Sequence, residues 1–371
     1  MKKFLIVQLA SFGDCLYATA IARQIKNDDP NSHVTWAISK RFAPILQLNP
    51  YVDHVLEIDI PAETPYYDPT FDKNFREKIV AKKTSGEFDE IIFSQIPQKN
   101  WGRFTGTIRA TTLAAYPGKI TVPVQPIVVL SEEEKNQVKL FAEKNHLQNY
   151  KEVILFECAP SSGQSLVNVN FAIGIATQMT KSQTDCCFIL SSPTAINSNN
   201  ARIIDASELS FRENAELSKY CSFLIGCSSG ITWICSSSAA KQLNTLQLLN
   251  KNSGIYAGLN FDLAAWQLPN GHVVEMTEYN QDKVMQCLQS YFNNGLETCR
   301  KQYNQTYQPN LMHLYTVAGF MHDNGEDFKS IFAFAHRYCE SNAKLNNPIH
   351  FNKWQLGLHL IVRRVKSRFG G

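Results

Sequence analysis

The 371-residue chain lacks the signatures of several large protein classes. Its formal net charge is only +3, which argues against a dedicated nucleic-acid-binding protein, because such proteins carry a concentrated basic surface. No stretch reaches the roughly 18 uninterrupted apolar residues that a transmembrane helix needs. The apolar run near Met1 is interrupted at Ser11, Gly13 and Asp14, so it predicts a strand and not a secretory signal. We therefore expect a cytoplasmic protein.

The ten cysteines show no ligand pattern. There is no CxxC pair and no Cys/His spacing typical of a metal site. Several cysteines lie inside apolar segments, which favours buried free thiols in a reducing compartment over disulfides or metal ligands. The histidines, among them His33, His54 and His313, are dispersed, and this favours structural roles for them. We expect neither a metal ion nor a cofactor.

The composition predicts a folded protein with more than one domain. Hydrophobic residues make up 44% of the chain and charged residues 19%, so enough apolar surface is present to offset the entropy of ordering. Single hydrophobic cores stop growing near about 250 to 300 residues, and longer chains divide into domains. Two domains are therefore expected.

The first half of the chain alternates strand-like and helix-like segments. They are a strand over Phe4–Leu9, a helix from Cys15 to about Asn27, a strand over His33–Ile38, a helix near Phe42–Leu48, and strand-like segments over Val52–Ile58, Glu90–Phe93 and Thr121–Val129. Such alternation is typical of βαβ units and of a mostly parallel sheet. The segment Pro61–Lys83 begins with several prolines and predicts a loop over the sheet edge.

The second half repeats this pattern after a charged helix over Glu132–His146. Its expected elements are strand Val153–Phe156, helix Phe171–Met179, strand Cys187–Ser191, short strand Ile203–Asp205, helix Phe211–Tyr220 and strand Phe223–Gly226. The α/β pattern predicts two Rossmann-like, doubly wound domains facing a cleft. We place them at residues 1–150 and 151–300, followed by a helical extension over residues 301–371.

Asp14 is the strongest single candidate for chemistry. The segment Ala10–Asp14 joins a buried strand to a helix, and open α/β folds bind ligands at the carboxyl ends of their strands. A carboxylate held on such a turn can take a proton from a hydroxyl group, and Gly13 lets the backbone pass close to a ligand. The alternative is that Asp14 caps the helix N-terminus, which spacing alone favours.

Three further segments, Ala18–Ile25, His33–Ile38 and Asn49–Val55, resemble the N-terminal half of the heptosyltransferase-like glycosyltransferases, glycosyltransferase family 9. The resemblance is close over residues 1–60 and looser over most of the remaining length. It implies the GT-B fold and inverting, metal-independent transfer of a sugar from a nucleotide-diphosphate donor. It also implies that Asp14 is the catalytic base and that Ser11, Phe12 and Gly13 belong to the acceptor loop.

A second candidate is the turn Gly226–Trp233, which ends a strand and begins a helix. Backbone N–H groups at a helix start, with nearby hydroxyl groups, can hold a phosphate. The turn resembles the family's Gly-x-Asp-Thr-Gly-x-x-His loop, which implies that it holds the donor pyrophosphate, but Ser228 replaces the Asp and Trp233 the His. An ordinary Ser/Gly-rich turn is the alternative. The candidate donor-binding residues here are Gly226, Ser228, Ser229, Gly230 and Thr232.

The loop Glu157–Gln164, directly after a strand, is the third candidate. It resembles the family's small-residue loop before a Lys-x-Trp-Pro segment, whose lysine is implied to neutralise donor phosphate. Gln164 falls near that lysine, and a neutral amide donates hydrogen bonds without offsetting phosphate charge. The candidate donor-binding residues in this loop are Ser161, Ser162 and Gln164. Lys99, Arg103 and Arg109 are alternative sources of positive charge, although solvated surface positions are favoured for all three.

The C-terminal segment Lys353–Phe369 predicts an amphipathic helix with a basic border. Its apolar face comprises Trp354, Leu358, Ile361, Val362, Val365 and Phe369, and its flanking basic residues are Arg363, Arg364, Lys366 and Arg368. Such a helix can lie in the interface of an anionic membrane, which would give peripheral contact with the inner membrane. Packing against the body of the protein is an equal alternative.

Taken together with these motifs, the family resemblance implies an inverting glycosyltransferase. It would transfer heptose or a related sugar, with ADP-heptose as a candidate donor, to a glycolipid or oligosaccharide acceptor of a bacterial surface glycan such as lipopolysaccharide core. A catalytically impaired GT-B-fold binding protein, or a transferase for a different nucleotide sugar, is the alternative, because the departures fall in the donor loops. A nucleotide-sugar epimerase or dehydrogenase is disfavoured, since no GxGxxG motif follows the first strand.

Overall fold

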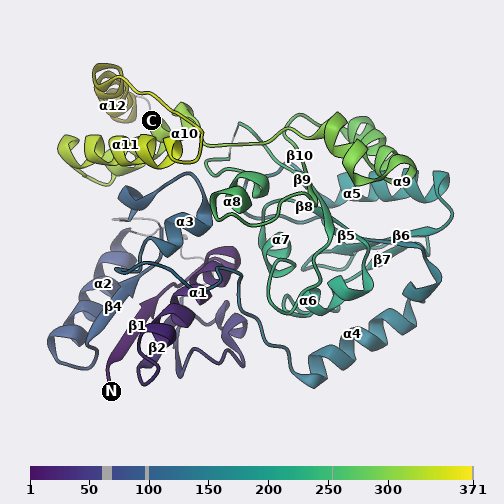
Figure 1. The fold of residues 1–371 in the computed structure, drawn as a ribbon, viewed down its shortest axis with the longest axis horizontal. Helices are drawn as coiled ribbons and strands as arrows, with labels where there is room; N and C mark the ends of the chain where they lie inside the picture. Colours follow the sequence, from purple (N-terminus) through teal and green to yellow (C-terminus); the bar gives the residue numbers. More distant parts are fainter. Residues whose placement is uncertain (61–68, 97–99, 253, 370–371) are drawn as a thin grey trace.

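The computed structural model describes residues 1–60, 69–96, 100–252 and 254–369. The chain forms two parallel β-sheets with helices on their faces, and a group of helices follows at the C-terminal end (Figure 1). Within the described residues, no helix is both long enough and apolar enough to cross a bilayer.

The first sheet has the strand order β3-β2-β1-β4, with every pair parallel. Phe4 and Ile6 of the first strand face one core, under the first helix, and Leu5 and Val7 face another, as the pleat of a strand requires. The elements of this part are β1 (Lys3–Val7), α1 (Phe12–Asp28), β2 (His33–Ser39), β3 (His54–Ile58), α2 (Pro69–Thr84), β4 (Glu90–Phe93) and α3 (Ile108–Leu113).

The second sheet has the order β10-β9-β8-β5-β6-β7 and is also parallel. Its central strand buries Phe156 under α5 and α9 and buries Leu155 on the face that looks toward the first sheet. The elements are α4 (Glu132–Lys144), β5 (Glu152–Glu157), α5 (Val169–Ser182), β6 (Cys186–Ser191), β7 (Ile203–Asp205), α6 (Glu213–Leu217), β8 (Phe223–Gly226), α7 (Gly230–Ile234), β9 (Asn244–Leu248), α8 (Leu259–Ala265), β10 (Val273–Met276) and α9 (Gln281–Tyr303).

Each sheet reverses its strand order at one point. In the first sheet, β2 and β3 continue to one side of β1 and β4 lies on the other. In the second sheet, β6 and β7 lie on one side of β5, and β8, β9 and β10 lie on the other. The loops after β1 and β4 therefore flank one switch point, and those after β5 and β8 flank the other. Ligands of open α/β folds bind in such crevices.

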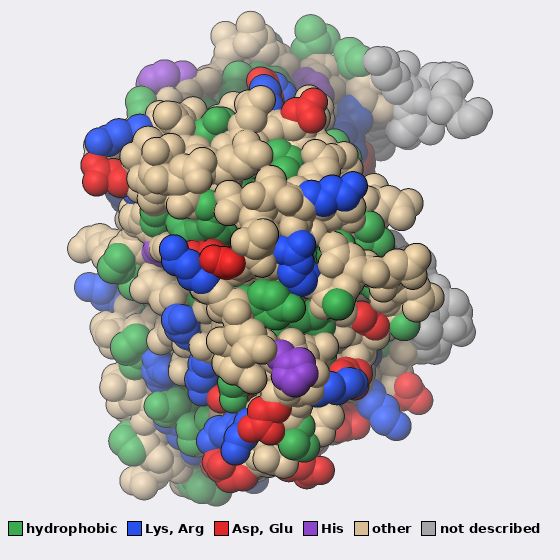
Figure 2. Space-filling view, turned by 90° about the vertical axis from the view of Figure 1, so that its right-hand side faces the viewer, with side chains coloured by type: hydrophobic (Ala, Val, Ile, Leu, Met, Phe, Trp, Pro, Cys, Tyr) green, Lys and Arg blue, Asp and Glu red, His purple; other side chains and the backbone are tan. Residues whose placement is uncertain are grey.

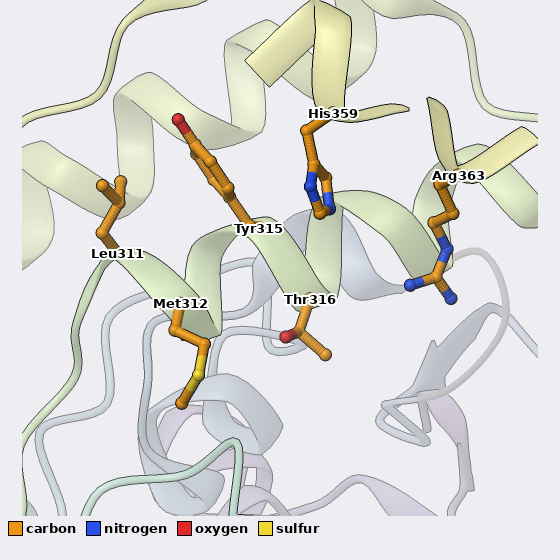
Figure 3. A pocket seen from close by; sticks show the side chains of 6 residues that line it. All are labelled: Leu311, Met312, Tyr315, Thr316, His359 and Arg363. Atoms are coloured by element: carbon orange, nitrogen blue, oxygen red, sulfur yellow. The ribbon is translucent and has the colours of Figure 1, made fainter. Parts of the chain in front are cut away.

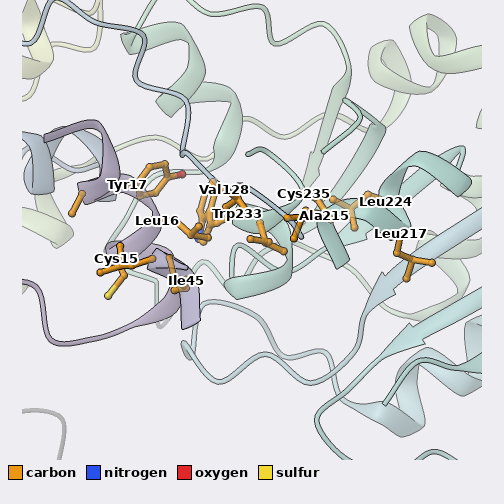
Figure 4. Packing of buried hydrophobic residues seen from close by; sticks show 14 of the residues in the cluster. Cys15, Leu16, Tyr17, Ile45, Val128, Ala215, Leu217, Leu224, Trp233 and Cys235 are labelled. Carbon is orange, nitrogen blue, oxygen red and sulfur yellow. The ribbon is translucent and has the colours of Figure 1, made fainter. Parts of the chain in front are cut away.

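One hydrophobic core spans the contact between the two halves. It joins Leu16 of α1 to Trp233 of α7, with Val128 of the connecting segment in the same cluster (Figure 4). Phe141 of α4 belongs to the cluster too, although α4 precedes the second sheet in the sequence. The two halves of the chain are thus packed together through apolar side chains.

Two predictions of local structure are wrong, and a third predicted element is shorter than expected. Thr121–Val129 forms no strand, because Pro123 and Pro126 lack backbone N–H groups and cannot sustain a ladder. The segment instead crosses between the halves, with the N–H of Ile127 donating to Oγ1 of Thr19 (2.9 Å) and that of Val128 to Oγ of Ser238 (3.1 Å).

The predicted loop over Pro61–Lys83 is the second wrong prediction of local structure. Residues 61–68 lie outside the described residues, and the rest is the helix α2. Pro69 fits the first helical position, where its missing N–H costs nothing, and strong helix formers follow it. In addition, the expected helix near Phe42–Leu48 is a short 3-10 turn over Ala43–Leu46.

Three helices form the C-terminal end: α10 (Leu311–Asp323), α11 (Phe328–Ala343) and α12 (Lys353–Phe369). They share a core with Trp101 and Phe104 from the first half of the chain, and Figure 1 shows them beside α3. The last helix has the bounds that the sequence indicates. The domain limits 1–150, 151–300 and 301–371 stay a prediction.

Candidate functional site

The loop after β1 is held in place by a side chain that follows β4. Oε1 of Gln95 accepts hydrogen bonds from the backbone N–H groups of Leu9 (2.8 Å) and Ala10 (3.2 Å). It also accepts one from Nε2 of Gln8 (3.0 Å), whose backbone carbonyl accepts from the indole of Trp36 (3.2 Å). The two loops at the first switch point therefore support each other.

Asp14 lies in the first turn of α1 and is partly exposed. The N-cap position belongs to Ser11, whose hydroxyl donates to Oδ2 of Asp14 across 3.5 Å. Asp14 therefore does not hold the capping position, although a carboxylate in the first turn is stabilised by the helix dipole. Its role as a base stays a prediction.

In the second half, a buried carboxylate holds the turn after β8. Oε2 of Glu157 accepts hydrogen bonds from the N–H of Cys227 (2.6 Å) and the hydroxyl of Thr232 (2.7 Å). Oε1 accepts from the N–H of Ile231 (2.8 Å). Burial raises the pKa of Glu157, although these hydrogen bonds favour the charged form. The N–H groups of Cys227 and Ile231 and the hydroxyl of Thr232 are thus paired within the protein.

Two glutamines complete the same turn. Oε1 of Gln247 accepts from the N–H of Ser228 (2.9 Å), and Nε2 of Gln164 donates to its carbonyl (3.3 Å). Gln164 also accepts at its own carbonyl from the N–H of Asn250 (2.7 Å). Ser228 has a left-handed backbone with φ of 52°, and its buried Oγ has no hydrogen-bond partner among the described residues. The loops after β5, β8 and β9 therefore meet around Ser228.

The predicted donor-binding residues are largely brought together. Gln164 contacts Ser228, and Thr232 is tied to the same turn through Glu157, which commits its hydroxyl to a protein partner. Ser161 and Ser162 are exposed on the neighbouring loop. Their roles toward a donor stay predictions.

The turns of the two halves touch. The rings of Phe12 and Phe211 stack with centroids 4.1 Å apart. A Cβ added to Gly13 would lie 2.6 Å from Cδ1 of Trp233, and one added to Gly230 would lie 2.9 Å from the ring of Phe211. Glycine is required at both positions by this close approach. The turn that carries Asp14 is therefore packed against the turn after β8.

Arg109 is not on the surface, and this expectation is wrong. It lies in α3, fully buried, with Nε 3.0 Å from Oδ2 of Asp262 in α8 and its guanidinium over the ring of Tyr17 (4.8 Å). Burial raises the pKa of Asp262 although the attraction of Arg109 opposes this. Arg103 is partly buried and donates to the carbonyl of Phe93 (2.7 Å). Lys99 lies outside the described residues.

A second buried carboxylate resembles Glu157. Glu275 of β10 accepts hydrogen bonds from the N–H of Asn260, at the start of α8, at 2.7 Å and from that of Tyr307 at 3.0 Å. Burial raises the pKa of Glu275 to about 7. Gly258 precedes α8 because a Cβ there would collide with this carboxylate. Two helix starts in the second half are thus neutralised by carboxylates of the chain itself.

All ten cysteines are free, and only Cys339 is not fully buried. The sulfur atoms of Cys287 and Cys299 lie 3.3 Å apart. Within the described ranges, no three side chains of His, Cys, Asp or Glu are arranged to hold a metal ion.

Sequence reasoning missed the polar residues that hold the site. The sequence pattern places Glu157 only at the start of a loop and gives no role to Gln247, Asp262 or Glu275. Each is a polar residue in or beside an apolar segment, and a buried polar group must find a partner. That signal indicates an internal hydrogen bond, although it does not identify the partner.

The comparisons with known proteins concern the fold. No family model matches the chain, and no curated protein matches it. A solved structure of a family 9 glycosyl transferase from Veillonella parvula is 14% identical, with a TM-score of 0.50 over 80% of this chain and 93% of that one. The chain has the GT-B fold. This confirms the predicted pair of doubly wound domains and the likeness, in fold, to family 9.

Two heptosyltransferases also match with lower scores. Escherichia coli ADP-heptose lipopolysaccharide heptosyltransferase II is 14% identical, with a TM-score of 0.47 over 67% of this chain and 85% of that one. An E. coli heptosyltransferase solved with ADP is 13% identical, with a TM-score of 0.44 over 79% and 99% of the two chains.

Proposed function

We propose that the protein is an inverting glycosyltransferase that takes a nucleotide-diphosphate sugar and an acceptor where the Ser11–Asp14 turn meets the Gly226–Trp233 turn. One observation above all supports the proposal: each turn lies at the switch point of its sheet, and the two turns touch. The shared fold is compatible with this chemistry without establishing it, since one fold serves many functions.

In this proposal Asp14 is the base. It takes the proton of the acceptor hydroxyl while that oxygen attacks the anomeric carbon of the donor sugar, and the nucleoside diphosphate leaves from the opposite face, which inverts the configuration. Side chains at the second turn, including Gln164, Ser228 and Ser229, donate hydrogen bonds to the leaving diphosphate. The proposal includes no metal ion.

The substrates follow from the sequence resemblance. The donor is ADP-heptose or a related nucleotide sugar, and the acceptor is a glycolipid or oligosaccharide of a bacterial surface glycan such as lipopolysaccharide core. We place the reaction in the cytoplasm. Gln164, Ser228 and Trp233 depart from the family pattern, so the sugar is the part of the proposal that a donor screen must decide.

A second candidate function, binding without transfer, is favoured by Glu157. A departing diphosphate gains negative charge, and the turn that would hold it is bonded to the buried carboxylate of Glu157, while Gln164 stands in place of a cation. A binding protein has no such charge to stabilise. It would bind a nucleotide sugar and release no product.

The experiment combines a donor screen with one substitution. Calorimetry measures binding of nucleotide sugars, and release of nucleoside diphosphate measures turnover. Asp14→Asn should keep donor binding and lose about 10² to 10⁴ in turnover, as expected for a general base. Asp29→Asn, which removes the same charge at the other end of α1, is the matched control.

Three results would contradict the proposal. Near-normal turnover of Asp14→Asn would leave Asp14 with a structural role only. Binding of a donor with no turnover in the wild type would select the binding protein. Absence of both, in a protein shown to be folded, would remove nucleotide sugars from this site.

A further inference from the structure

The last helix has two apolar faces that point in opposite directions. Leu356 and Leu360 are fully buried in the core shared by α10, α11 and α12. The opposite face is exposed and consists of residues spaced four, seven and eight positions apart, which share one side of a helix. Its side chains, with the exposed fraction of each, are Trp354 (89%), Leu358 (63%), Ile361 (54%) and Val362 (43%). Packing within the chain accounts only for the inner face.

Polar contacts fix which face of α12 points inward. Figure 3 shows His359 and Arg363 of α12 directed toward α10, where they line a groove with Tyr315. The rings of His359 and Tyr315 lie 5.2 Å apart. Arg363 binds Asp323, with Nη2 2.7 Å from Oδ2. A rotation of α12 that buried Trp354 would break these contacts, so the exposed apolar face is a fixed feature of the fold.

The chain around this face is basic. No Asp or Glu follows Glu340. The basic residues after that position are Lys344, Lys353, Arg363, Arg364, Lys366 and Arg368. On the face that Figure 2 shows, by contrast, Lys, Arg, Asp and Glu are interspersed. Positive charge is therefore concentrated at the end of the chain although the net charge is only +3.

We propose that the outer face of α12 docks on an anionic phospholipid bilayer. The helix would lie in the plane of the membrane, with Trp354 and Leu358 at the boundary of the acyl chains and the exposed Lys353 beside them. The basic sequence of the chain end would be attracted to the headgroups, while Arg363 stays paired with Asp323. Trp suits this depth because its ring is apolar and its N–H stays in contact with polar groups. A second copy of the chain fits the face poorly, since pairing like faces brings basic residues together. The inference does not depend on sugar transfer.

Vesicle co-sedimentation of the full chain tests the docking. We expect binding to phosphatidylcholine vesicles that contain phosphatidylglycerol to be at least about tenfold tighter than to phosphatidylcholine alone, because each basic residue near an anionic leaflet strengthens binding several-fold. High salt should weaken binding to the anionic vesicles, because ions screen this attraction. Equal binding to both vesicle types, or binding to neither, would overturn the proposal.

A triple variant tests the apolar face directly. Trp354→Ser, Leu358→Ser and Ile361→Ser together should lose about tenfold or more in affinity for anionic vesicles, since three apolar side chains leave the interface. The matched control removes three exposed apolar side chains elsewhere: Val80→Ser, Leu140→Ser and Leu166→Ser. The control should bind as the wild type does. All six positions are exposed, so thermal unfolding should show both variants folded. Unchanged vesicle binding by the first variant would refute the proposal.

Tryptophan fluorescence gives a second readout. Trp354 is almost fully exposed, whereas Trp36, Trp101 and Trp233 are buried and Trp266 is partly buried. Anionic vesicles should therefore shift the emission to the blue and shield it from a water-soluble quencher, and Trp354→Phe should remove both effects while vesicle binding persists. A wild type that self-associates through this face and shows no spectral change with vesicles would assign the face to a second copy and overturn the proposal.

Discussion

Glu157→Gln tests how the turn after β8 is held. The carboxylate accepts three hydrogen bonds, two at Oε2 and one at Oε1, at distances of 2.6 to 2.8 Å. Glutamine offers one acceptor oxygen and one amide that donates. When the amide oxygen of the glutamine takes the place of Oε2, it accepts the hydrogen bonds of Cys227 and Thr232. The amide nitrogen then faces the N–H of Ile231, and two donors meet. At least one donor is left without its carboxylate partner in either orientation.

The expected loss of stability follows from these contacts. An unsatisfied buried N–H costs about 1 to 3 kcal/mol, and each remaining hydrogen bond weakens by about 1 kcal/mol when its acceptor loses its charge. Removing the charge also relieves the desolvation that raises the pKa of Glu157. The net reduction in the free energy of unfolding should be on the order of 2 kcal/mol.

Urea unfolding and a double-mutant cycle provide the assay. Thr232→Val removes the hydroxyl donor, and the cycle of Glu157→Gln with Thr232→Val should show a coupling of about 1 kcal/mol, because the two side chains share a hydrogen bond. Glu152→Gln, at the other end of β5 and partly exposed, is the control and should cost less than about 1 kcal/mol. Additive effects, or a loss at Glu157 no larger than at Glu152, would refute the assignment.

Two further predictions concern the other buried carboxylates. Asp262→Asn should cost about 3 to 5 kcal/mol in urea unfolding because it leaves Arg109 buried without a counter-charge, and the double variant Arg109→Met with Asp262→Leu should recover most of this loss; an equal loss in the double variant would contradict the ion pair as the cause. For Glu275, a pKa of about 7 against an ordinary value of 4.5 means that the folded state binds more protons between these values, so this group lowers the free energy of unfolding as pH rises through that window. Relative to the wild type, Glu275→Gln should remove a pH-dependent component on the order of 3 kcal/mol, and an unchanged pH slope would show that Glu275 titrates normally.

The sequence predicted the elements whose signal is local. The strands at Phe4, Glu90 and Phe223 are apolar runs bounded by turn residues, and each appears within about two residues of its expected limits. The alternation of strands and helices then predicts parallel sheets, and the glycine-containing turns after β1 and β8 fall at the switch points.

The sequence could not predict what depends on distant partners. In Thr121–Val129 the two prolines argue against a strand, but only the place of the segment between the two sheets explains why the N–H groups of Ile127 and Val128 bond to side chains. Arg109 looks like any surface cation until Asp262 is placed beside it. Glu157 ends a strand, and its three donors come from a turn in a separate part of the chain. Tertiary pairing, and not local propensity, decides these positions.

The two candidate functions make opposite demands on the charge at the second switch point. Glu157 and Glu275 neutralise the starts of α7 and α8, so a ligand bound beside them meets hydrogen-bond donors and no unpaired positive helix end. Sugar transfer requires stabilisation of a diphosphate as it departs, and the carboxylate of Glu157, which ends β5 and is bonded to this turn, opposes that charge in a region of low dielectric. Binding alone requires only complementarity to the ground state, which uncharged donors such as Gln164 and Ser229 can provide. If transfer occurs, the stabilising groups must therefore lie on the exposed side of the turn, and Glu157 acts there only by holding the backbone in shape.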